Sequence, residues 1–313
     1  SRKTLMANRQ TISFIKRRLN EAGIYPVSRY GQNFLTDLNL VRMIADSAKL
    51  GPQDVALEIG TGTGSLTAMI AEKAGHVITV EIDKNLHQLA REELASFNNI
   101  TFLQQDALRN KNNFSQELLD AIATAMSQIE GAQLKLVANL PYNIATPIIS
   151  NLLTHEEFVP TSMTATIQKE LGERIVARPA TSDFGSLSLW IQAQCDAEIV
   201  RIMNPSVFWP RPKVHSAIVH IVTNPEKRAR IKNLKNYQQF IRSVFIHRRK
   251  YLRSVLITVF KNQLTRQDVD ETLESMGLKG EYRAEQLAVA VMIELCERLY
   301  ERVAAVEQEG NTQ

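Results

Sequence analysis

The sequence predicts an α/β fold in which a doubly wound, mostly parallel sheet precedes a smaller, all-helical domain. Between residues 54 and 106 short apolar runs alternate with helical stretches, and this β-α-β-α-β order is typical of a parallel sheet. After Asn224 only helical periodicity remains, so a domain boundary is expected near residue 225. The predicted parts are a basic amino-terminal extension over 1–28, an α/β domain over 29–225 and a helical domain over 226–313.

The apolar runs place the predicted strands in chain order. They lie at 55–59, 76–80, 100–103, 134–138, 163–168, 197–203 and 215–223. Helices are predicted to begin near Ser65 and Lys84 and to occupy 185–194. The polar stretch 108–133 predicts an inserted loop and helix.

The helical domain carries its own start and stop signals. Thr265 followed by Asp268 predicts a capped helix start, and Gly277 predicts a stop. Apolar residues then recur every four positions, as one face of a helix requires. These are Leu287, Val291, Leu295, Leu299 and Val303.

The composition is that of an ordinary globular protein. A chain of 313 residues with 44% apolar content can bury a full core. Cys195 and Cys296 lie far apart without a ligand-spaced partner, which indicates core cysteines in a reducing compartment and no structural metal. No apolar run approaches the roughly 20 residues that span a bilayer, and the start, SRKT, is unlike a signal peptide. We therefore expect no membrane segment and a cytoplasmic location.

The net charge of +4 is unevenly distributed. Between Glu226 and Lys261 eleven Lys and Arg side chains stand against one acid, and residues 1–18 contain six more and no acid. Concentrated positive charge indicates a polyanion partner, because neutralising phosphates releases counterions and gives affinity without sequence specificity. Solvated helix faces are the alternative explanation of the same charges.

A glycine-rich turn, EIGTGTGSLT at 58–67, follows the first strand and opens a helix. Glycines there permit a tight turn and let a ligand touch the backbone. A dinucleotide fingerprint has the order G-x-G-x-x-G, but this chain has G-x-G-x-G with Ser65 where the third glycine should fall. The turn alone therefore fits nucleotide sites of several chemistries and argues against a nicotinamide dinucleotide.

Two carboxylates follow the next two strands. Glu81 stands about 20 residues beyond the glycines, where a carboxylate accepts hydrogen bonds from both ribose hydroxyls. Asp106 is placed to accept from an adenine amino group. Each carboxylate alone is equally compatible with a helix cap or a turn. Three ligand-compatible features at successive strand ends together indicate an adenosine-containing cofactor.

The fourth predicted strand ends abruptly in VANLPYN at 137–143. Pro141 has no N–H for a ladder and pushes Leu140 toward an extended conformation, so the chain leaves the sheet there. This places the Asn139 amide and the Tyr142 phenol at a strand's carboxyl end, where open α/β sheets bind ligands.

Five motifs, one of them the NLPY part of this segment, together resemble a known family. The motifs are GQNFL at 31–35, NLPY at 139–142, NPSVFWPRPKVHSA at 204–217, FIHRRK at 245–250 and RAEQL at 283–287. They are similar to the class I S-adenosylmethionine-dependent methyltransferases and, more narrowly, to the ribosomal RNA adenine N6,N6-dimethyltransferases of the bacterial KsgA group. The resemblance implies a Rossmann-like class I methyltransferase sheet. It runs from about Gly31 into the helical domain, and it leaves the extension and the 108–133 insertion without an assigned activity.

The resemblance implies a site for S-adenosylmethionine. Asn33 and Leu35 would close over its methionine part, Gly60 would lie against it, Glu81 would bind the ribose and Asp106 the adenine. The predicted cofactor-contacting residues are Gln32, Asn33, Leu35, Gly60, Gly62, Gly64, Glu81, Ile82, Asp106, Ala107 and Asn139. No metal is predicted.

The predicted catalytic residues are Asn139, Leu140, Pro141, Tyr142 and Phe208. An adenine N6 lone pair is delocalised into the ring. We therefore expect the Asn139 side-chain oxygen and the Leu140 carbonyl to accept both N6 hydrogens and to aim the lone pair at the methyl group. Tyr142 offers a face on which the base can stack. Phe208 either covers the opposite face or is a core residue.

The predicted RNA-binding residues are Arg248, Arg249, Lys250 and Arg253, which would grip the RNA backbone. The resemblance implies methyl transfer to N6 of two adjacent adenines in the 3′-terminal hairpin loop of 16S rRNA, giving N6,N6-dimethyladenosines. The partner would be the assembling small ribosomal subunit. A monomer is expected.

Other functions stay open at this point. A 23S rRNA adenine-N6 methyltransferase of the erythromycin-resistance type is disfavoured by the long helical domain with RAEQL, and a DNA adenine methyltransferase by NLPY in place of D-P-P-Y. A non-catalytic RNA-binding assembly or transcription factor would not need the intact 139–142 set. An NAD-dependent dehydrogenase is disfavoured by Ser65 and by the lack of a clear acid–base pair.

Overall fold

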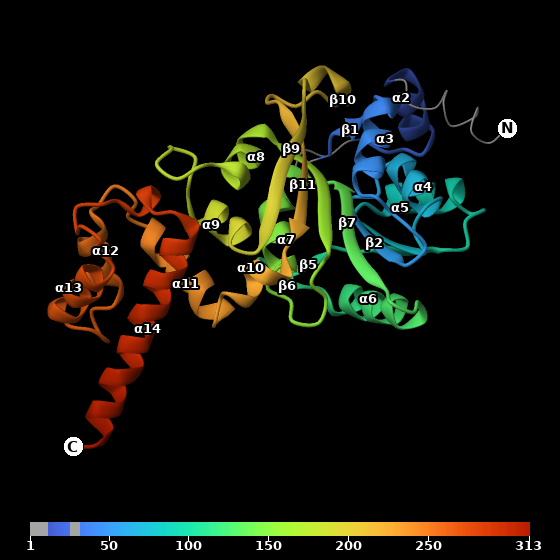
Figure 1. The fold of residues 1–313 in the computed structure, drawn as a ribbon. Coiled ribbons are helices and arrows are strands. Elements are labelled where there is room, and N and C mark those ends of the chain that lie inside the picture. Colours follow the sequence, from blue (N-terminus) through green and yellow to red (C-terminus); the bar gives the residue numbers. More distant parts are fainter. Residues whose placement is uncertain (1–11, 26–31) are drawn as a thin grey trace. The chain divides into compact units, whose positions relative to one another are not determined.

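Figure 1 shows a computed structural model of the protein, which describes residues 12–25 and 32–313. The chain divides into two compact units. The first contains residues 1–172 and 198–223, and the second contains residues 173–197 and 224–313. Residues 173–197 are predicted to belong to the α/β domain, whereas here they cluster with the helical residues that follow position 224.

A seven-stranded sheet with the order β4-β3-β2-β7-β8-β11-β9 forms the centre of the first unit. The strands are β2 (Asp54–Ile59), β3 (His76–Glu81), β4 (Ile100–Gln104), β7 (Gln133–Asn139), β8 (Ser162–Gln168), β9 (Cys195–Met203) and β11 (Ser216–Thr223). Strands β4, β3, β2, β7 and β8 are parallel, and β11 runs antiparallel to β8. The predicted doubly wound α/β sheet is confirmed, and each predicted strand agrees with an observed one to within two residues.

The strand order reverses between β2 and β7. From β2 the chain winds outward to β3 and β4 and then returns to β7 on the other side of β2. Open α/β sheets bind ligands in the crevice outside the carboxyl ends of the strands at such a switch point. Gly60 follows β2 and Asn139 ends β7, so two predicted site residues meet here.

Helices connect the strands and cover them. In the first unit they are α2 (Ile12–Glu21), α3 (Leu38–Ser47), α4 (Ser65–Ala71), α5 (Lys84–Glu93), α6 (Gln116–Gln128), η2 (Tyr142–Ile144), α7 (Ala145–Leu152) and η3 (Pro205–Val207), and α8 (Lys169–Val176) crosses between the units. Ile44 of α3 and Ile70 of α4 pack with Val137 of β7 in one apolar cluster, and all three are fully buried. Burying each such side chain contributes about 1.5–3 kcal/mol, which fixes these helices on the sheet.

Two short antiparallel pairs accompany the main sheet. Strand β1 (Phe34–Leu35) pairs with β10 (Phe208–Trp209), and β5 (Leu108–Asn110) pairs with β6 (Asn113–Phe114). The Asn110 side-chain oxygen accepts the Asn112 N–H at 2.9 Å and so stabilises the turn between β5 and β6. The stretch 108–133 therefore contains the predicted helix, but its predicted loop is a small hairpin.

Helices make up the second unit beyond residue 224, as predicted. The unit contains α9 (Ser186–Gln192), α10 (Pro225–Ala229), α11 (Leu234–Phe245), α12 (Leu252–Val259), α13 (Arg266–Ser275), η4 (Ala284–Gln286) and α14 (Val289–Asn311). The Phe260 ring lies 6.2 Å from Phe240 and 5.6 Å from Tyr300, centroid to centroid, within its core. Cys195 and Cys296 are buried and are not joined in a disulfide, as predicted for core cysteines.

The predicted helix signals of this unit are confirmed at α13. Thr265 Oγ1 accepts the Asp268 N–H at 3.1 Å, and the Asp268 carboxylate accepts the Thr265 N–H at 2.9 Å. Gly277 follows the helix with φ of +65°. The predicted face of α14 needs a correction, because η4 turns the chain before the helix and leaves Leu287 outside it. The buried face consists of Met292, Leu295, Cys296, Leu299 and Val303.

Within residues 12–25 and 32–313, none of the helices is both long enough and apolar enough to cross a membrane.

Candidate active site

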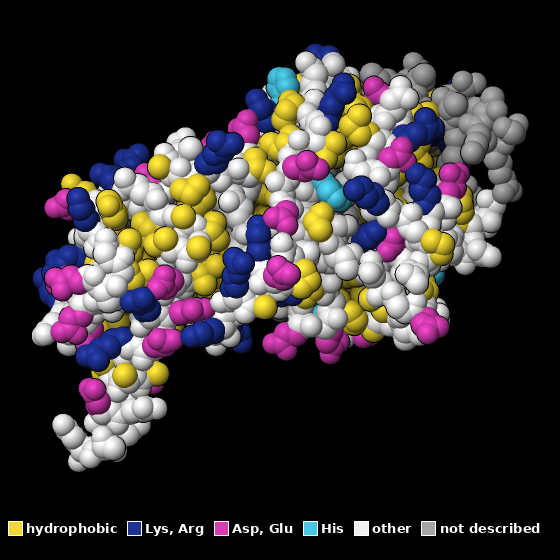
Figure 2. Space-filling view, in the orientation of Figure 1, with side chains coloured by type: hydrophobic (Ala, Val, Ile, Leu, Met, Phe, Trp, Pro, Cys, Tyr) yellow, Lys and Arg dark blue, Asp and Glu magenta, His cyan; other side chains and the backbone are white. Residues whose placement is uncertain are grey.

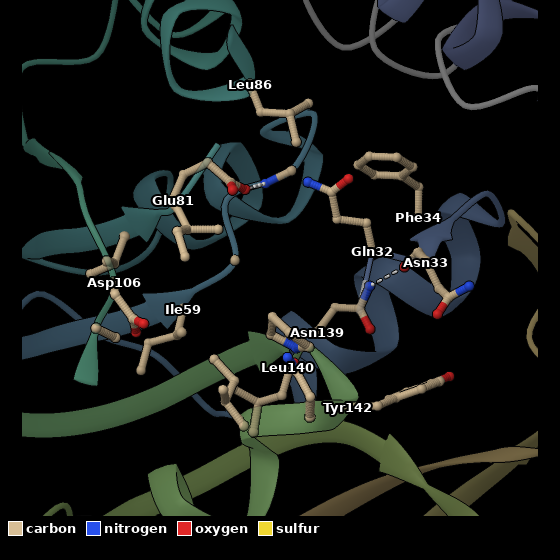
Figure 3. A pocket seen from close by; sticks show the side chains of 18 of the residues that line it. Gln32, Asn33, Phe34, Ile59, Glu81, Leu86, Asp106, Asn139, Leu140 and Tyr142 are labelled. Atoms are coloured by element: carbon tan, nitrogen blue, oxygen red, sulfur yellow. Dashed lines mark hydrogen bonds between the residues drawn. The ribbon is translucent and has the colours of Figure 1, made fainter. Parts of the chain in front are cut away.

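A cavity of about 310 Å³ opens at the carboxyl ends of β2, β3, β4 and β7 (Figure 3). Small-molecule sites typically span about 300–1,000 Å³. The predicted residues that line it are Gln32, Asn33, Gly60, Gly62, Glu81, Ile82, Asp106, Ala107, Asn139, Leu140, Pro141 and Tyr142. The fold therefore gathers most of the predicted cofactor and catalytic residues in one place. The lining residues that sequence reasoning missed are Phe34, Ile59, Val80, Leu86, Gln105, Asn143 and Ile144.

The glycine turn approaches the opposite wall closely. Gly60 has φ of +89°, and a Cβ added to it would stand 3.2 Å from Pro141 Cδ. Any other residue would be strained there and would push the NLPY segment away. The predicted Gly60 and Pro141 are thus close neighbours in the cavity wall.

The Glu81 carboxylate is held by backbone groups. One oxygen accepts the Gly62 N–H and the other accepts the Asp83 N–H, both at 2.9 Å, and Figure 3 marks the bond to Gly62. Burial raises the pKa of Glu81, while these two hydrogen bonds act in the opposite direction. Each carboxylate oxygen has two lone pairs, so Glu81 keeps capacity to accept ribose hydroxyls.

The end of β4, next to β3, supplies further polar groups to the cavity. Asp106 accepts the Leu108 N–H at 2.9 Å, which fixes its carboxylate. The Gln105 Nε2 donor is buried and has no hydrogen-bond partner among the described residues. Buried donors are rarely left unpaired in folded proteins. Because Gln105 also lines the cavity, this donor fits a ligand acceptor such as an adenine ring nitrogen.

The charge of the cavity suits a cationic ligand. Glu81 and Asp106 line it, whereas no Lys, Arg or His from the described part of the chain does. Among the same residues no group of three His, Cys, Asp or Glu could hold a metal ion. The residues present therefore fit S-adenosylmethionine, whose sulfonium is positive and whose adenosine offers hydroxyls and ring nitrogens.

Asn139 ends β7 and Leu140 follows it, both residues line the cavity, and Figure 3 shows the Asn139 side-chain amide there. Asn139 Nδ2 donates to the Asn33 carbonyl at 3.1 Å. A carbonyl can only accept, so this bond fixes the amide orientation and leaves Oδ1 as an acceptor. The Leu140 N–H donates a hydrogen bond to the Thr166 carbonyl at 3.2 Å. Within the described ranges, no residue donates to Asn139 Oδ1 or to the Leu140 carbonyl.

The pairing of β1 with β10 holds Asn33 in place. Leu35 pairs with Phe208 and Phe34 with Trp209, which joins GQNFL to the FWP part of the 204–217 motif. Asn33 Nδ2 also donates to the Pro210 carbonyl at 2.5 Å. Two-residue strands carry almost no periodicity, so sequence reasoning did not find this pairing.

Tyr142 stands at the rim of the cavity and is half-buried. Its hydroxyl shares a hydrogen bond with the Ser216 hydroxyl, at the start of β11. Burial raises the pKa of Tyr142, so the phenol stays neutral. The bond to Ser216 restrains the ring direction, and it explains a serine in the 204–217 motif that the sequence left without a role.

Three predicted site residues lie outside the main cavity. Phe208 is 2% exposed and packs in the apolar core with Leu40 and Ile218. Leu35 joins the same core and lines a neighbouring cavity of about 50 Å³. Gly64 caps α4 with φ of +85°, and a Cβ there would meet Leu94 at 3.1 Å. The structure thus places Phe208 as a core residue, and a role against the base requires it to leave this core.

The predicted RNA-binding residues divide into two pairs. Arg248 donates to the carbonyls of Ser182 and Phe184 and pairs with Glu285 at 2.5 Å. These three partners of Arg248 belong to the same unit as Arg248 itself. Arg253 makes a bidentate ion pair with Asp270, in which Nε and Nη2 donate to the two carboxylate oxygens at 2.6 and 3.1 Å. In contrast, Arg249 and Lys250 are exposed.

The positive charge of the basic segment, residues 226–261, is partly neutralised by neighbouring acids in the folded chain. Lys227 pairs with Asp196 at 2.7 Å and Lys232 with Glu301 at 3.2 Å. Acids from outside the segment therefore face at least four of its eleven bases. Figure 2 shows Lys and Arg interspersed with Asp and Glu on the visible face.

A buried carboxyl beneath the glycine turn was not predicted. Glu58 is 1% exposed and accepts hydrogen bonds from the Thr67 and Thr79 hydroxyls, the latter at 2.7 Å. Thr79 is also 2.6 Å from the Thr61 hydroxyl. Burial raises the pKa of Glu58 to about 8. Its signal in the sequence is an acid inside an otherwise apolar strand, directly before the glycines.

Known proteins resemble this chain in sequence and in fold. A family model described as ribosomal RNA adenine dimethylase matches residues 27–301. The chain belongs to this family. It is 36% identical over 273 residues to a Clostridium acetobutylicum protein named ribosomal RNA small subunit methyltransferase A, covering 87% of this chain and 93% of that protein. The chain is therefore an S-adenosylmethionine-dependent rRNA adenine dimethyltransferase.

Two solved structures resemble the chain of this dimethyltransferase. A dimethyladenosine transferase from Plasmodium falciparum has a TM-score of 0.71 at 24% identity, covering 86% of this chain and 98% of its own. The 23S rRNA methyltransferase ErmE has a TM-score of 0.57 at 26% identity, covering 87% and 99%. The class I methyltransferase fold is thereby established.

The family match corrects one sequence expectation. It includes residues 108–133, which the sequence analysis placed outside the resemblance. Family-specific motifs are absent there, so motif reading alone could not include the hairpin and α6.

Replacing Glu58 by Gln should remove a pH dependence of the dimethyltransferase's stability. Between the ordinary value of 4.5 and about 8, folded Glu58 holds a proton that the unfolded chain has released. The free energy of unfolding therefore falls as pH rises through this window, by up to about 1.4 kcal/mol per pH unit. Urea unfolding of both proteins across the window measures the difference, and parallel curves would contradict this assignment of the proton.

Gln105→Met should weaken binding of S-adenosylhomocysteine roughly two- to tenfold, the usual worth of one hydrogen bond. Calorimetric titration measures this affinity. The ligand-free melting temperature is the control, because the Gln105 donor makes no described hydrogen bond that the methionine would lose. Unchanged affinity would show that this donor does not reach the cofactor.

Proposed function

We propose that this dimethyltransferase modifies N6 of two adjacent adenines in the 3′-terminal hairpin loop of 16S rRNA, in the assembling small ribosomal subunit. The observation that carries the proposal is the pair of unengaged acceptors, Asn139 Oδ1 and the Leu140 carbonyl, at one end of a cofactor-sized cavity. The name of the Clostridium acetobutylicum relative supports the small subunit over the 23S alternative. We further propose that it acts as a cytoplasmic monomer.

The reaction needs a nitrogen lone pair that points at an incoming methyl group. In adenine this lone pair is spread into the ring, and the amino group is flat. S-adenosylmethionine supplies a methyl group on a positively charged sulfur. The chain's contribution is to accept both N6 hydrogens, through Asn139 Oδ1 and the Leu140 carbonyl, and so to favour a tetrahedral nitrogen.

The same acceptors stabilise the charge that develops on nitrogen. Both are preorganised, because Asn139 is tied to Asn33 and the Leu140 N–H to Thr166. Preorganised polar groups aimed at developing charge are worth roughly 2.7–4 kcal/mol each. A strong general base is unnecessary, since the alkylated nitrogen is acidic.

Tyr142 provides the stacking surface for the extruded base. Stacking on an aromatic side chain contributes about 1–3 kcal/mol per base, and the bond to Ser216 limits the freedom that the ring would lose on binding. Phe208 would form the second side of this clamp only if RNA binding drew it out of the core. Loop adenines can be splayed out at small cost, which suits this geometry.

The helical unit would hold the RNA backbone. Arg249 and Lys250 are exposed, and we assign the phosphate contacts to them. Arg248 and Arg253 would act indirectly, since their ion pairs with Glu285 and Asp270 fix the segments on either side of this pair. This division modifies the expectation that all four residues grip RNA.

The experiment that tests the function offers labelled S-adenosylmethionine with undermethylated small subunits, large subunits or duplex DNA, and then maps the modified base. The proposal expects two adjacent N6,N6-dimethyladenosines near the 3′ end of 16S rRNA. Label in 23S rRNA or DNA alone would contradict it.

Asn139→Ala should slow methyl transfer by roughly a hundred- to a thousandfold, the cost of one preorganised acceptor or donor. RNA binding should be retained, because the residue has no part in holding the backbone. Single-turnover rates with undermethylated small subunits measure the loss. Tyr142→Phe is the matched control, since it keeps the ring and removes only the Ser216 contact. Near-normal turnover by Asn139→Ala would contradict the mechanism.

Arg249→Gln with Lys250→Gln should weaken RNA binding and flatten its salt dependence, by roughly 0.7–0.9 in slope per lost phosphate contact. Filter binding over a range of salt concentrations measures the slope. Arg248→Gln is the structural counterpart: it should lower the melting temperature, because the Ser182 and Phe184 carbonyls lose a donor. An unchanged slope in the double variant would remove these residues from the RNA interface.

A further inference from the structure

Helix α2 of the amino-terminal extension packs against the cofactor site, although the family match begins only at residue 27. Ile15 and Leu19 are 1% exposed and lie on one face of the helix, four positions apart. They form an apolar cluster with Phe34, Leu86 and other side chains of the first unit. The inner face of α2 is therefore part of the α/β unit's core.

The two side chains that α2 covers are themselves walls of the cofactor cavity. Phe34 and Leu86 both line it, and Figure 3 shows them on the side away from Asn139. Phe34 stacks on Trp209 with ring centroids 6.4 Å apart, and a Cβ at Gly62 would meet it at 3.4 Å. Phe34 thus contacts the glycine turn on one side and α2 on another.

Polar contacts seat α2 in this position. Arg18 forms an ion pair with Glu93 at the end of α5, and both side chains are partly buried. Lys16 Nζ lies 5.2 Å from the centroid of the Trp209 ring. In contrast, Arg17 and Asn20 are exposed, and the Arg17 guanidinium lies 5.6 Å from the ring centroid of Phe14 in the same helix. The helix therefore has a seated face and a solvent face that can be varied separately.

We propose that α2 is the outer wall of the S-adenosylmethionine site, so that a segment outside the family match sets cofactor affinity. Phe34 and Leu86 enclose the cavity only while Ile15 and Leu19 hold them from behind. Without this support both side chains gain rotamer freedom, which the cofactor must remove when it binds. The extension, to which the sequence analysis assigned no activity, is thereby a positioning element.

The test compares the two faces of α2 in the full-length chain. Ile15→Ala with Leu19→Ala should weaken S-adenosylhomocysteine binding about tenfold, the ordering cost of two side chains. Arg17→Ala with Asn20→Ala should leave the affinity unchanged. Calorimetry without RNA measures both, so failure here is distinct from failure of the proposed RNA substrate.

A charge swap keeps the proposal testable if the inner-face variant does not fold. Arg18→Glu should weaken S-adenosylhomocysteine binding, and adding Glu93→Arg should restore it by re-forming the ion pair between α2 and α5. A folded inner-face variant with wild-type affinity would overturn the proposal. So would an equal loss in the outer-face variant, or a charge swap that leaves affinity at the level of Arg18→Glu.

Discussion

The hydrogen bond from the Asn139 side-chain amide to the Asn33 carbonyl decides what this site can do. Because a carbonyl only accepts, the bond assigns the amide nitrogen and leaves the oxygen at the tip of β7 for a substrate. Asn33 is itself held by Pro210 and by the pairing of β1 with β10. Motifs from three distant parts of the chain thus fix the orientation of one side-chain amide in the wall of the cavity.

The surroundings of this acceptor favour positive charge. Glu81 and Asp106 line the cavity, and no described Lys, Arg or His does. The backbone N–H groups of Gly62 and Asp83 hold the Glu81 carboxylate without introducing a countercharge. Neutral Tyr142 borders the other end. The lining is therefore compatible with a positively charged sulfonium donor. It is equally compatible with an amine that becomes cationic during methyl transfer, so the same negative charge suits both the cofactor and the reaction.

Sequence reasoning succeeded where periodicity or chemistry leaves a local mark. The strands and the glycine turn have such marks, whereas the role of the acceptors after β7 stays a prediction. It leaves a role open where that role depends on partners elsewhere in the chain. Phe208 carries the same aromatic ring whether it stacks on a base or, as found, fills the core. In the sequence Arg248 is one of several basic residues in a row. Only the structure shows that it binds Glu285 and two backbone carbonyls. The seat of α2 depends on tertiary contacts that no motif records.

The most direct measurement of the central claim is a structure of the protein with S-adenosylhomocysteine and a hairpin RNA that carries the target adenines. The account predicts the flipped adenine N6 within about 3 Å of both Asn139 Oδ1 and the Leu140 carbonyl, at hydrogen-bond distance. It also predicts that Asn139 Nδ2 still donates to Asn33. A complex in which the amide has turned its nitrogen toward N6, or in which other groups accept the N6 hydrogens, would contradict it.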